Sequence, residues 1–191
     1  MSIKILAGQL RGAVLAVPDS ARPTLLRFRQ SLFDILVSIE KNPEVFFKNK
    51  VVLDCFAGSG ALGIESLSRG AAFSYFVDIS QKAVSAIYEN VKKLAIENRS
   101  KIIKTDILKI RPPQEKITCD IVFIDPPYGK VSIRKTLQRL AKTDWIDENS
   151  LIVTEEDTIK AENLSDLTEI IIERNLGKST FKIMKAKINL L

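Results

Sequence analysis

The residues best suited to chemistry are Asp125, Pro126, Pro127 and Tyr128, which directly follow the apolar run 121–124. An Asp at the carboxyl end of a strand offers acceptor oxygens, and two prolines remove two backbone donors and fix φ. The Tyr adds a flat aromatic face. Such a set can hold a planar group that bears an exocyclic amine, although a strand followed by an Asp-Pro turn is the alternative for these four residues alone.

A glycine-rich loop lies upstream. Gly58, Gly60 and Gly63 form a G-x-G-x-x-G pattern between a strand-like and a helical run, and Asp78 follows Gly58 by twenty residues, which is typical of a dinucleotide site. Asp54 argues against that reading, because its carboxylate would repel a pyrophosphate at about 4 Å by on the order of 1 kcal/mol even in water. A cationic cofactor without phosphate removes the conflict, and S-adenosylmethionine is such a cofactor.

Each part of S-adenosylmethionine has a candidate partner. The glycines allow close backbone approach to the methionine part, Asp54 can accept from the ammonium group, and Asp78 can accept from both ribose hydroxyls. Asp106, after a third strand, can accept from the adenine amine. The predicted cofactor-binding residues are Asp54, Phe56, Gly58, Ser59, Gly60, Gly63, Asp78, Ile79, Asp106 and Ile107.

Four carboxylates thus end four successive predicted strands: Asp54, Asp78, Asp106 and Asp125. Carboxyl ends of parallel strands meet at one edge of a sheet, where ligands of open α/β folds bind. A single Asp after a strand is more often a turn or a helix cap, but four in register with a glycine loop favour a ligand site. Glu65, early in the next helix, either favours the helix dipole or contacts the cofactor.

Hydrophobic periodicity predicts the elements that position these residues. Predicted strands are 51–55, 73–77, 102–104, 120–124 and 151–154, and predicted helices are 60–68, 81–96 and 133–141. This βαβαβ order, with continuous apolar strands, indicates a parallel sheet covered on both faces. Residues 167–176 and 179–188 predict an antiparallel hairpin around Gly177 and Lys178. The layout is that of an α/β, class I S-adenosylmethionine-dependent methyltransferase, Rossmann-like, with a mostly parallel seven-stranded sheet.

The first 42 residues are predicted to form an N-terminal extension of the main domain, 43–191. Residues 3–6 and 13–17 predict a small hairpin, and 25–39 a helix with Thr24 as its N-cap. Five basic residues lie within residues 1–30 against Asp19 alone: Lys4, Arg11, Arg22, Arg27 and Arg29. A clustered basic region indicates a polyphosphate partner, although a solvated face is the simpler alternative.

Composition excludes several kinds of site. The chain has no His, so a Ser-His-Asp triad and the commonest general base are absent. Two cysteines, Cys55 and Cys119, argue against a disulfide framework and a structural zinc site, and we expect no metal. No apolar run approaches the roughly 20 residues of a membrane span and no signal segment is evident, so we expect a cytoplasmic protein.

Methyl transfer to a nucleobase amine can proceed without imidazole. The amine is a weak nucleophile because its lone pair is delocalised into the ring. We hypothesise that the Asp125 side chain and the Pro126 carbonyl each accept from one N–H and localise that pair, while Tyr128 stacks on the base, worth roughly 1–3 kcal/mol. Asp, with an ordinary pKa of about 3.9, is a poor base for a neutral amine, so proton loss would follow methylation.

Residues 54–71, DCFAGSGALGIESLSRGA, together with Asp125 to Tyr128, resemble the bacterial RsmD family of small-subunit ribosomal RNA guanine-N2 methyltransferases. Residues 5–12 and 22–33 resemble that family's RNA-facing extension, and 176–180 its final hairpin. The resemblance implies S-adenosylmethionine as donor and the N2 amine of one guanine of 16S rRNA, within the small ribosomal subunit, as acceptor. The RNA-binding residues it implies are Arg11, Arg22, Thr24, Arg27 and Arg29. Two positions depart from the family's pattern. Leu25-Leu26 stands where the family usually has a polar pair, and Asp78 stands where it more often has Glu.

Two other functions remain open at this point. A DNA adenine-N6 methyltransferase would use the same four residues, but a target-recognition domain has little room in 191 residues. A non-catalytic RNA-binding ribosome-assembly factor could keep the cofactor pocket, but it would have no chemical need for Asp125 to Tyr128. We expect a monomer.

Overall fold

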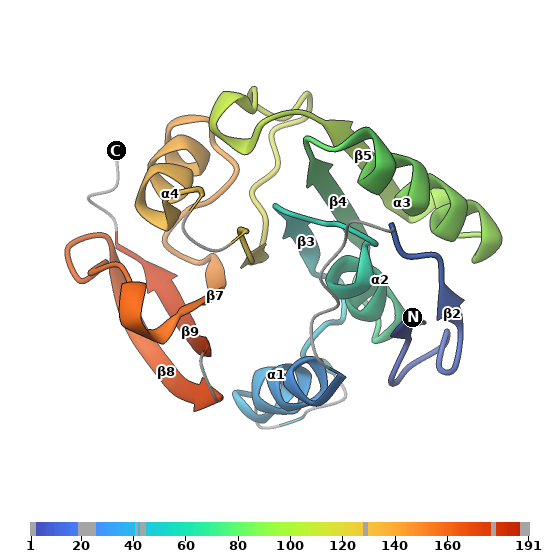
Figure 1. The fold of residues 1–191 in the computed structure, drawn as a ribbon, viewed down its shortest axis with the longest axis horizontal. Coiled ribbons are helices and arrows are strands. Elements are labelled where there is room, and N and C mark those ends of the chain that lie inside the picture. Colours follow the sequence, from blue (N-terminus) through green and yellow to red (C-terminus); the bar gives the residue numbers. More distant parts are fainter. Residues whose placement is uncertain are drawn as a thin grey trace. The chain divides into compact units, whose positions relative to one another are not determined.

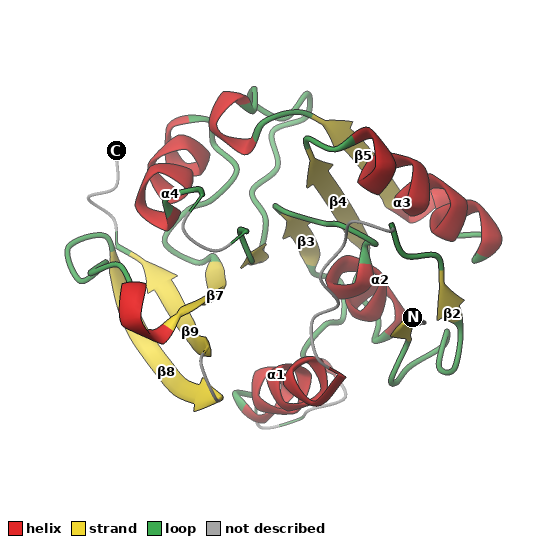
Figure 2. Ribbon diagram, viewed as in Figure 1, coloured by secondary structure: helices red, strands yellow, loops and turns green. Residues whose placement is uncertain are grey.

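A computed structural model of the protein describes residues 3–18, 26–40, 42, 45–127, 130–176 and 179–187, apart from the side chains of 26–28, 160 and 176. The chain divides into two compact units, Met1–Lys104 and Thr105–Leu191. From residue 51 to residue 160, each strand is followed by a helix or a 3₁₀ turn (Figures 1 and 2). Among the described residues, no helix has the length and apolar character needed to cross a bilayer.

The first unit contains a parallel sheet in the order β5-β4-β3 and a small antiparallel hairpin of β1 with β2. Its elements are β1 (Ile3–Lys4), β2 (Val14–Leu15), α1 (Leu26–Ser38), β3 (Val51–Asp54), α2 (Ala61–Ser68), β4 (Phe73–Asp78), α3 (Gln81–Lys93), the 3₁₀ turn η2 (Glu97–Arg99) and β5 (Ser100–Lys104). Strand β4 lies in the middle of this sheet, and its residues 74–77 are all buried, as expected for a strand covered on both faces.

Helix α3 shows why these segments are helical. Its apolar side chains recur at helical spacing, and Ser80 caps its start by accepting from the N–H of Ala83 at 3.5 Å. The helix ends at Lys93, three residues before the predicted end. Ala95 takes a left-handed φ of 52°, and the N–H groups of Ala95 and Ile96 bond back to Lys92 and Val91. This is a Schellman stop, which the apolar pattern alone could not reveal.

The second unit holds the strands β6-β7-β9-β8, parallel between β6 and β7 and antiparallel at β9. Its elements are the 3₁₀ turn η3 (Ile107–Lys109), β6 (Ile121–Ile124), α4 (Ile133–Lys142), β7 (Leu151–Asp157), the 3₁₀ turn η4 (Thr158–Lys160), β8 (Thr168–Leu176) and β9 (Ser179–Ala186). The inner strand β9 is buried on both faces, and its Lys182 forms an ion pair with Glu156 at 2.7 Å. A buried ammonium requires such a partner.

The first unit supplies three strands of the main sheet and the second unit supplies four. The strands are parallel except for those of the C-terminal hairpin, which confirms the predicted fold class. The N-terminal hairpin and the helix 25–39 are confirmed as β1, β2 and α1. Strand β7 continues to Asp157, beyond the predicted 154, because β9 pairs with it along that whole length. The predicted N-cap Thr24 lies outside the described residues.

Candidate functional site

The glycine loop joins β3 to α2 and is tied to the end of β4. Gly58 and Gly60 have φ of 55° and 78°, a left-handed backbone that glycine adopts without steric cost. The Oδ2 of Asp78 accepts from the N–H of Gly58 at 2.9 Å, and its Oδ1 accepts from Ser80 at 2.8 Å. Each oxygen keeps a second lone pair, so Asp78 can still accept from a ligand hydroxyl while it holds the loop.

Gly63, the third glycine, lies inside α2. A Cβ at this position would come within 2.4 Å of Phe76 Cε1 and 2.6 Å of Ser74 Oγ, both on β4. Contacts this short do not occur in folded proteins, so Gly63 is needed for α2 to pack on the sheet. The close approach that we predicted for the methionine part of a cofactor is therefore left to Gly58 and Gly60.

Asp54, the last residue of β3, is 3% exposed, and its Oδ2 accepts from the N–H of Gly63 at 3.2 Å. The pKa of this carboxyl is raised to about 7, mainly by burial and in smaller part by the charge of Asp78, while the Gly63 hydrogen bond acts in the opposite direction. Two carboxylates thus lie near each other at the ends of adjacent parallel strands. A positive ligand group would relieve their repulsion and a phosphate would increase it.

This donor and acceptor set fits S-adenosylmethionine. The ligand's cationic groups suit Asp54 and its diol suits Asp78. The backbone at Gly58, where an added Cβ would meet only the Phe56 carbonyl at 3.9 Å, leaves room for close approach. Phe56 is half-buried, Ser59 is buried, and Ile79 is 67% exposed.

Asp106 and Ile107 belong to the second unit. The Oδ1 of Asp106 accepts from the N–H of Leu108 at 3.0 Å and so caps η3, while Ile107 is buried. This is the cap role that an Asp after a strand most often has. The adenine contact of Asp106 stays a prediction.

The Asp-Pro-Pro-Tyr motif directly follows β6 in the second unit. Asp125 is half-buried, Pro126 is buried, and Pro127 is exposed with its carbonyl accepting from the N–H of Lys130 at 3.0 Å. Tyr128 lies outside the described residues. The next element, α4, is held at its start by Glu162, whose carboxylate accepts from Ser132 Oγ and from the N–H groups of Ile133 and Arg134 at 2.7 to 3.1 Å.

The predicted RNA-binding residues have different environments. Arg11 is exposed in the hairpin, whereas Arg22 and Thr24 lie outside the described residues, and so does the side chain of Arg27 in α1. Arg29 is only 2% exposed, its Nη2 donates to the Lys4 carbonyl at 2.5 Å, and burial lowers its pKa. This placement does not favour the RNA contact predicted for Arg29, because its guanidinium is enclosed where it holds α1 against the hairpin.

Glu65 and Asn90 have roles that the sequence reasoning missed. The Oε2 of Glu65 accepts from Leu6 N–H at 2.7 Å, and its Oε1 accepts from Ala7 N–H at 3.0 Å and from Arg69 Nε at 2.8 Å. Glu65 therefore anchors the N-terminal segment to α2.

Asn90 links that segment to the glycine loop. Its Oδ1 accepts from Ala16 N–H at 2.7 Å, and its Nδ2 donates to the carbonyls of Ala16 and Ser59, both at 2.9 Å. The helical spacing that predicts the apolar stripe of α3 also places Asn90 on it, between Ile87 and Val91. A polar residue on a buried stripe is the signal that could have revealed the link.

Comparisons with known proteins agree with this architecture. The family model described as conserved hypothetical protein 95 matches residues 3–185. Proteins named ribosomal RNA small subunit methyltransferase D are similar: one from Buchnera aphidicola subsp. Acyrthosiphon pisum is 38% identical over 157 residues (81% of this chain, 78% of that protein). Another, from Escherichia coli K12, is 34% identical over 155 residues (80% of this chain, 74% of that protein).

Solved structures extend the similarity over nearly the whole chain. The Escherichia coli protein yhhF, described as a candidate methyltransferase, has a TM-score of 0.83 at 27% identity and covers 99% of this chain and 100% of its own. A candidate methylase from Haemophilus influenzae has a TM-score of 0.79 at 26% identity, covering 97% and 99%. With a family model that spans almost every residue and relatives of this similarity, the chain belongs to the RsmD family of methyltransferases.

Proposed function

We propose that this protein transfers a methyl group from S-adenosylmethionine to the exocyclic N2 amine of a guanine in 16S rRNA of the small ribosomal subunit. Membership of the RsmD family and relatives named ribosomal RNA small subunit methyltransferase D support the reaction and the RNA. The choice of the guanine N2 amine rests on the resemblance of residues 54–71 and of Asp125 to Tyr128. The proposal includes a monomer working in the cytoplasm.

The observation that carries the proposal is the pair of carboxylates at the glycine loop. Asp54 is buried with its pKa raised to about 7, and the charge of Asp78 contributes to that shift. An anionic dinucleotide would add a third negative group to this region, which costs free energy. A cofactor with an ammonium and a sulfonium group instead supplies the missing positive charge.

Bound at this site, S-adenosylmethionine would supply an electrophilic methyl group. Asp54 would accept from its ammonium group, Asp78 from its ribose hydroxyls, and Asp106 from its adenine amine, with Phe56, Ile79 and Ile107 adding apolar contact. The backbone of Gly58, Ser59 and Gly60 would border the methionine part. The acceptor oxygens of Asp54 and Asp78 and the left-handed backbone of Gly58 and Gly60 support this arrangement.

The residues after β6 would hold the acceptor base. Asp125 and the Pro126 carbonyl would each accept one N–H of the guanine amine, so that the nitrogen lone pair is no longer spread into the ring, and Tyr128 would stack on the base. Pro126 and Pro127 have no N–H to compete for the same acceptors. The base must be unpaired or leave its stack to reach them, and Arg11, Arg22, Thr24 and Arg27 would contact the surrounding RNA.

A labelling experiment tests the proposal. The protein is incubated with methyl-labelled S-adenosylmethionine and, separately, with assembled small subunits lacking the modification, naked 16S rRNA and duplex DNA. We expect label in the RNA, and mass spectrometry of a nuclease digest should identify N2-methylguanosine. Label only in DNA would replace the proposal by an adenine-N6 methyltransferase, and label in none of the substrates would leave a non-catalytic RNA-binding factor.

A further inference from the structure

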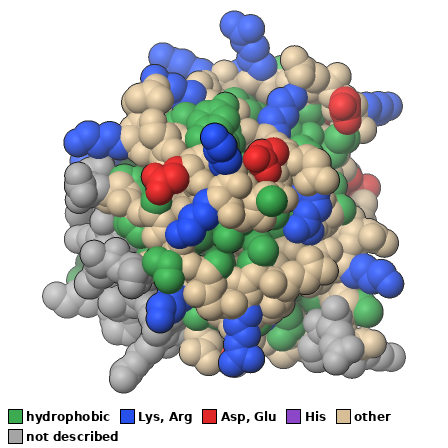
Figure 3. All heavy atoms as spheres, turned by 90° about the vertical axis from the view of Figure 1, so that its right-hand side faces the viewer, with side chains coloured by type: hydrophobic (Ala, Val, Ile, Leu, Met, Phe, Trp, Pro, Cys, Tyr) green, Lys and Arg blue, Asp and Glu red, His purple; other side chains and the backbone are tan. Residues whose placement is uncertain are grey.

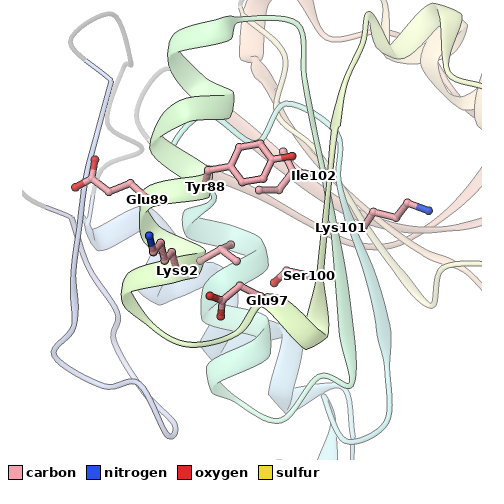
Figure 4. A pocket seen from close by; sticks show the side chains of 8 residues that line it. Tyr88, Glu89, Lys92, Glu97, Ser100, Lys101 and Ile102 are labelled. Atoms are coloured by element: carbon pink, nitrogen blue, oxygen red, sulfur yellow. The ribbon is translucent and has the colours of Figure 1, made fainter.

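A shallow hollow of about 540 Å³ lies between α3 and the outer strand β5 of the first unit. Figure 4 shows its lining, in which the ring of Tyr88 lies beside Ile102, and Ser100 and Glu97 face the same space from the end of the connection between the two elements. Lys92 borders the hollow from α3. None of these residues belongs to the predicted cofactor, catalytic or RNA-binding sets, so the hollow is without an assigned role.

Two side chains in the hollow suggest a missing ligand. Tyr88 is 58% exposed on the solvent-facing side of α3, so its aromatic ring is accessible to a ligand. The Ser100 Oγ is buried and has no hydrogen-bond partner among the described residues, whereas most buried polar atoms have one. An aromatic face next to a free hydroxyl and the Glu97 carboxylate matches a nucleobase, which stacks through its ring and hydrogen-bonds through its edge.

The charge around the hollow fits the phosphates that accompany a base. Residues 81–104 contain six basic side chains and two acidic ones, and Lys82, Lys92, Lys93 and Lys104 are exposed. Figure 3 shows Lys and Arg spread over the side of the molecule on which α3 lies, with few acidic groups between them. A single-stranded nucleic acid is the partner that combines stacking bases with a chain of negative charge.

This surface also continues into the N-terminal hairpin. The Lys93 Nζ donates to the carbonyl of Val14 in β2 at 2.8 Å, and Arg11 is exposed on the same hairpin. A strand held along α3 would therefore adjoin the segment to which we assign RNA contacts.

We propose that the hollow between α3 and β5 binds an unpaired nucleotide of the RNA substrate. The base stacks on Tyr88, its edge meets Ser100 and Glu97, and the neighbouring phosphate lies near Lys92. The inference rests on the proposed function in its choice of RNA, and it adds a second contact site distinct from the residues that hold the guanine to be modified.

Fluorescence anisotropy with a labelled single-stranded adenosine decamer RNA tests the site on the full chain. We expect Tyr88→Ala to weaken binding about tenfold through loss of one stacked base, and Tyr88→Phe to stay within about twofold of the unmodified protein. Lys92→Ala should reduce the slope of log affinity against log salt by about 0.7, the value for one phosphate contact on a single strand. Lys142→Ala, an exposed Lys at the end of α4 in the other unit, is the matched control.

Several outcomes would overturn the site. Unchanged binding by Tyr88→Ala, or an equal loss with Tyr88→Phe, would remove stacking as its basis. Weaker binding of Tyr88→Ala to assembled subunits with unchanged binding to the decamer would assign the hollow to a ribosomal protein instead. The labelling experiment on the unmodified protein reports the proposed function separately, because it does not depend on Tyr88. Thermal unfolding of each variant confirms that the exposed substitutions leave the fold intact.

Discussion

Asp54 and Glu65 are both buried carboxylates of the first unit and both accept from backbone N–H groups, but they are satisfied to different degrees. Glu65 accepts from two backbone N–H groups and the Arg69 guanidinium at 2.7 to 3.0 Å. Among the described residues, Asp54 has one donor, Gly63, at the longer distance of 3.2 Å. Burial with so few donors raises the pKa of Asp54 to about 7, because little compensates for its lost hydration.

The second unit contains another carboxylate that, like Glu65, accepts from three donors within the chain. Glu162 accepts from three donors at the start of α4 and thereby neutralises part of the positive helix end. The comparison teaches that a carboxylate with a full set of donors within the chain serves as an anchor. One that is buried with a single donor keeps its acceptor capacity for a ligand.

The largest effect should come from Asp125→Ala, which tests a carboxylate assigned to substrate rather than to anchoring. Methyl transfer should fall on the order of a thousandfold, or about 4 kcal/mol, because the amine loses a placed acceptor. Isothermal titration should show cofactor affinity within about twofold of the original, and Glu148→Ala, an exposed acid of the same unit, serves as control. Full activity in Asp125→Ala would refute the assignment.

Glu65→Gln tests whether Glu65 anchors the N-terminal segment or binds the cofactor. It leaves Arg69 without its buried partner and weakens the bonds to Leu6 and Ala7, so the free energy of unfolding should fall by about 3 kcal/mol. Urea unfolding measures the loss, and hydrogen exchange should be faster at the amides of Leu6 and Ala7. Glu40→Gln, at an exposed site, should change neither. Normal stability together with lost cofactor binding would contradict the anchor role of Glu65.

Asp54→Asn should remove a pH dependence. Because folding raises the Asp54 pKa from 3.8 to about 7, its stability contribution is full below pH 3.8 and is lost as pH rises through about 7. Between about pH 4 and about pH 7, the free energy of unfolding of the unmodified protein should therefore decrease. The decrease should be smaller for Asp54→Asn.

The same carboxylate predicts the opposite trend for cofactor affinity. A cationic ligand needs the ionised form, so affinity should rise roughly tenfold from about pH 6 to about pH 8. The absence of His leaves few other side chains to titrate in this range. Calorimetry at both pH values with the unmodified protein and Asp54→Asn measures the difference, and equal slopes in the two proteins would contradict the proposed ammonium contact.

The smallest effect is expected for Asn90→Ala, which breaks the link between the N-terminal segment and the loop next to Asp54. Loss of its bonds to Ala16 and Ser59 should reduce the unfolding free energy by about 1–2 kcal/mol. It should also raise the KM for both cofactor and RNA, since both binding segments lose a shared support. Asn98→Ala, at an exposed position, is the control. A rise in neither KM would limit Asn90 to stability alone.

The glycine loop, Asp78 and the order of strands and helices could be predicted because local spacing specifies them. Gly58 and Gly60 need a left-handed backbone, and the apolar runs specify which segments lie inside. The environment of Arg29 could not be predicted in this way. A basic residue near other basic residues suggested a polyphosphate contact, but its exposure depends on the hairpin and helix that enclose it.

The fold class, the family and the types of group that end the strands could be predicted from local patterns, since these depend on periodicity and on contiguous motifs. Which carboxylates are anchors and which retain acceptor capacity depends instead on the three-dimensional packing. The backbone donors to Glu65 lie 58 and 59 residues away in the chain, and the backbone donor to Asn90 lies 74 residues away. No local pattern encodes such pairs, because they form only when packing brings distant backbone donors to a buried oxygen.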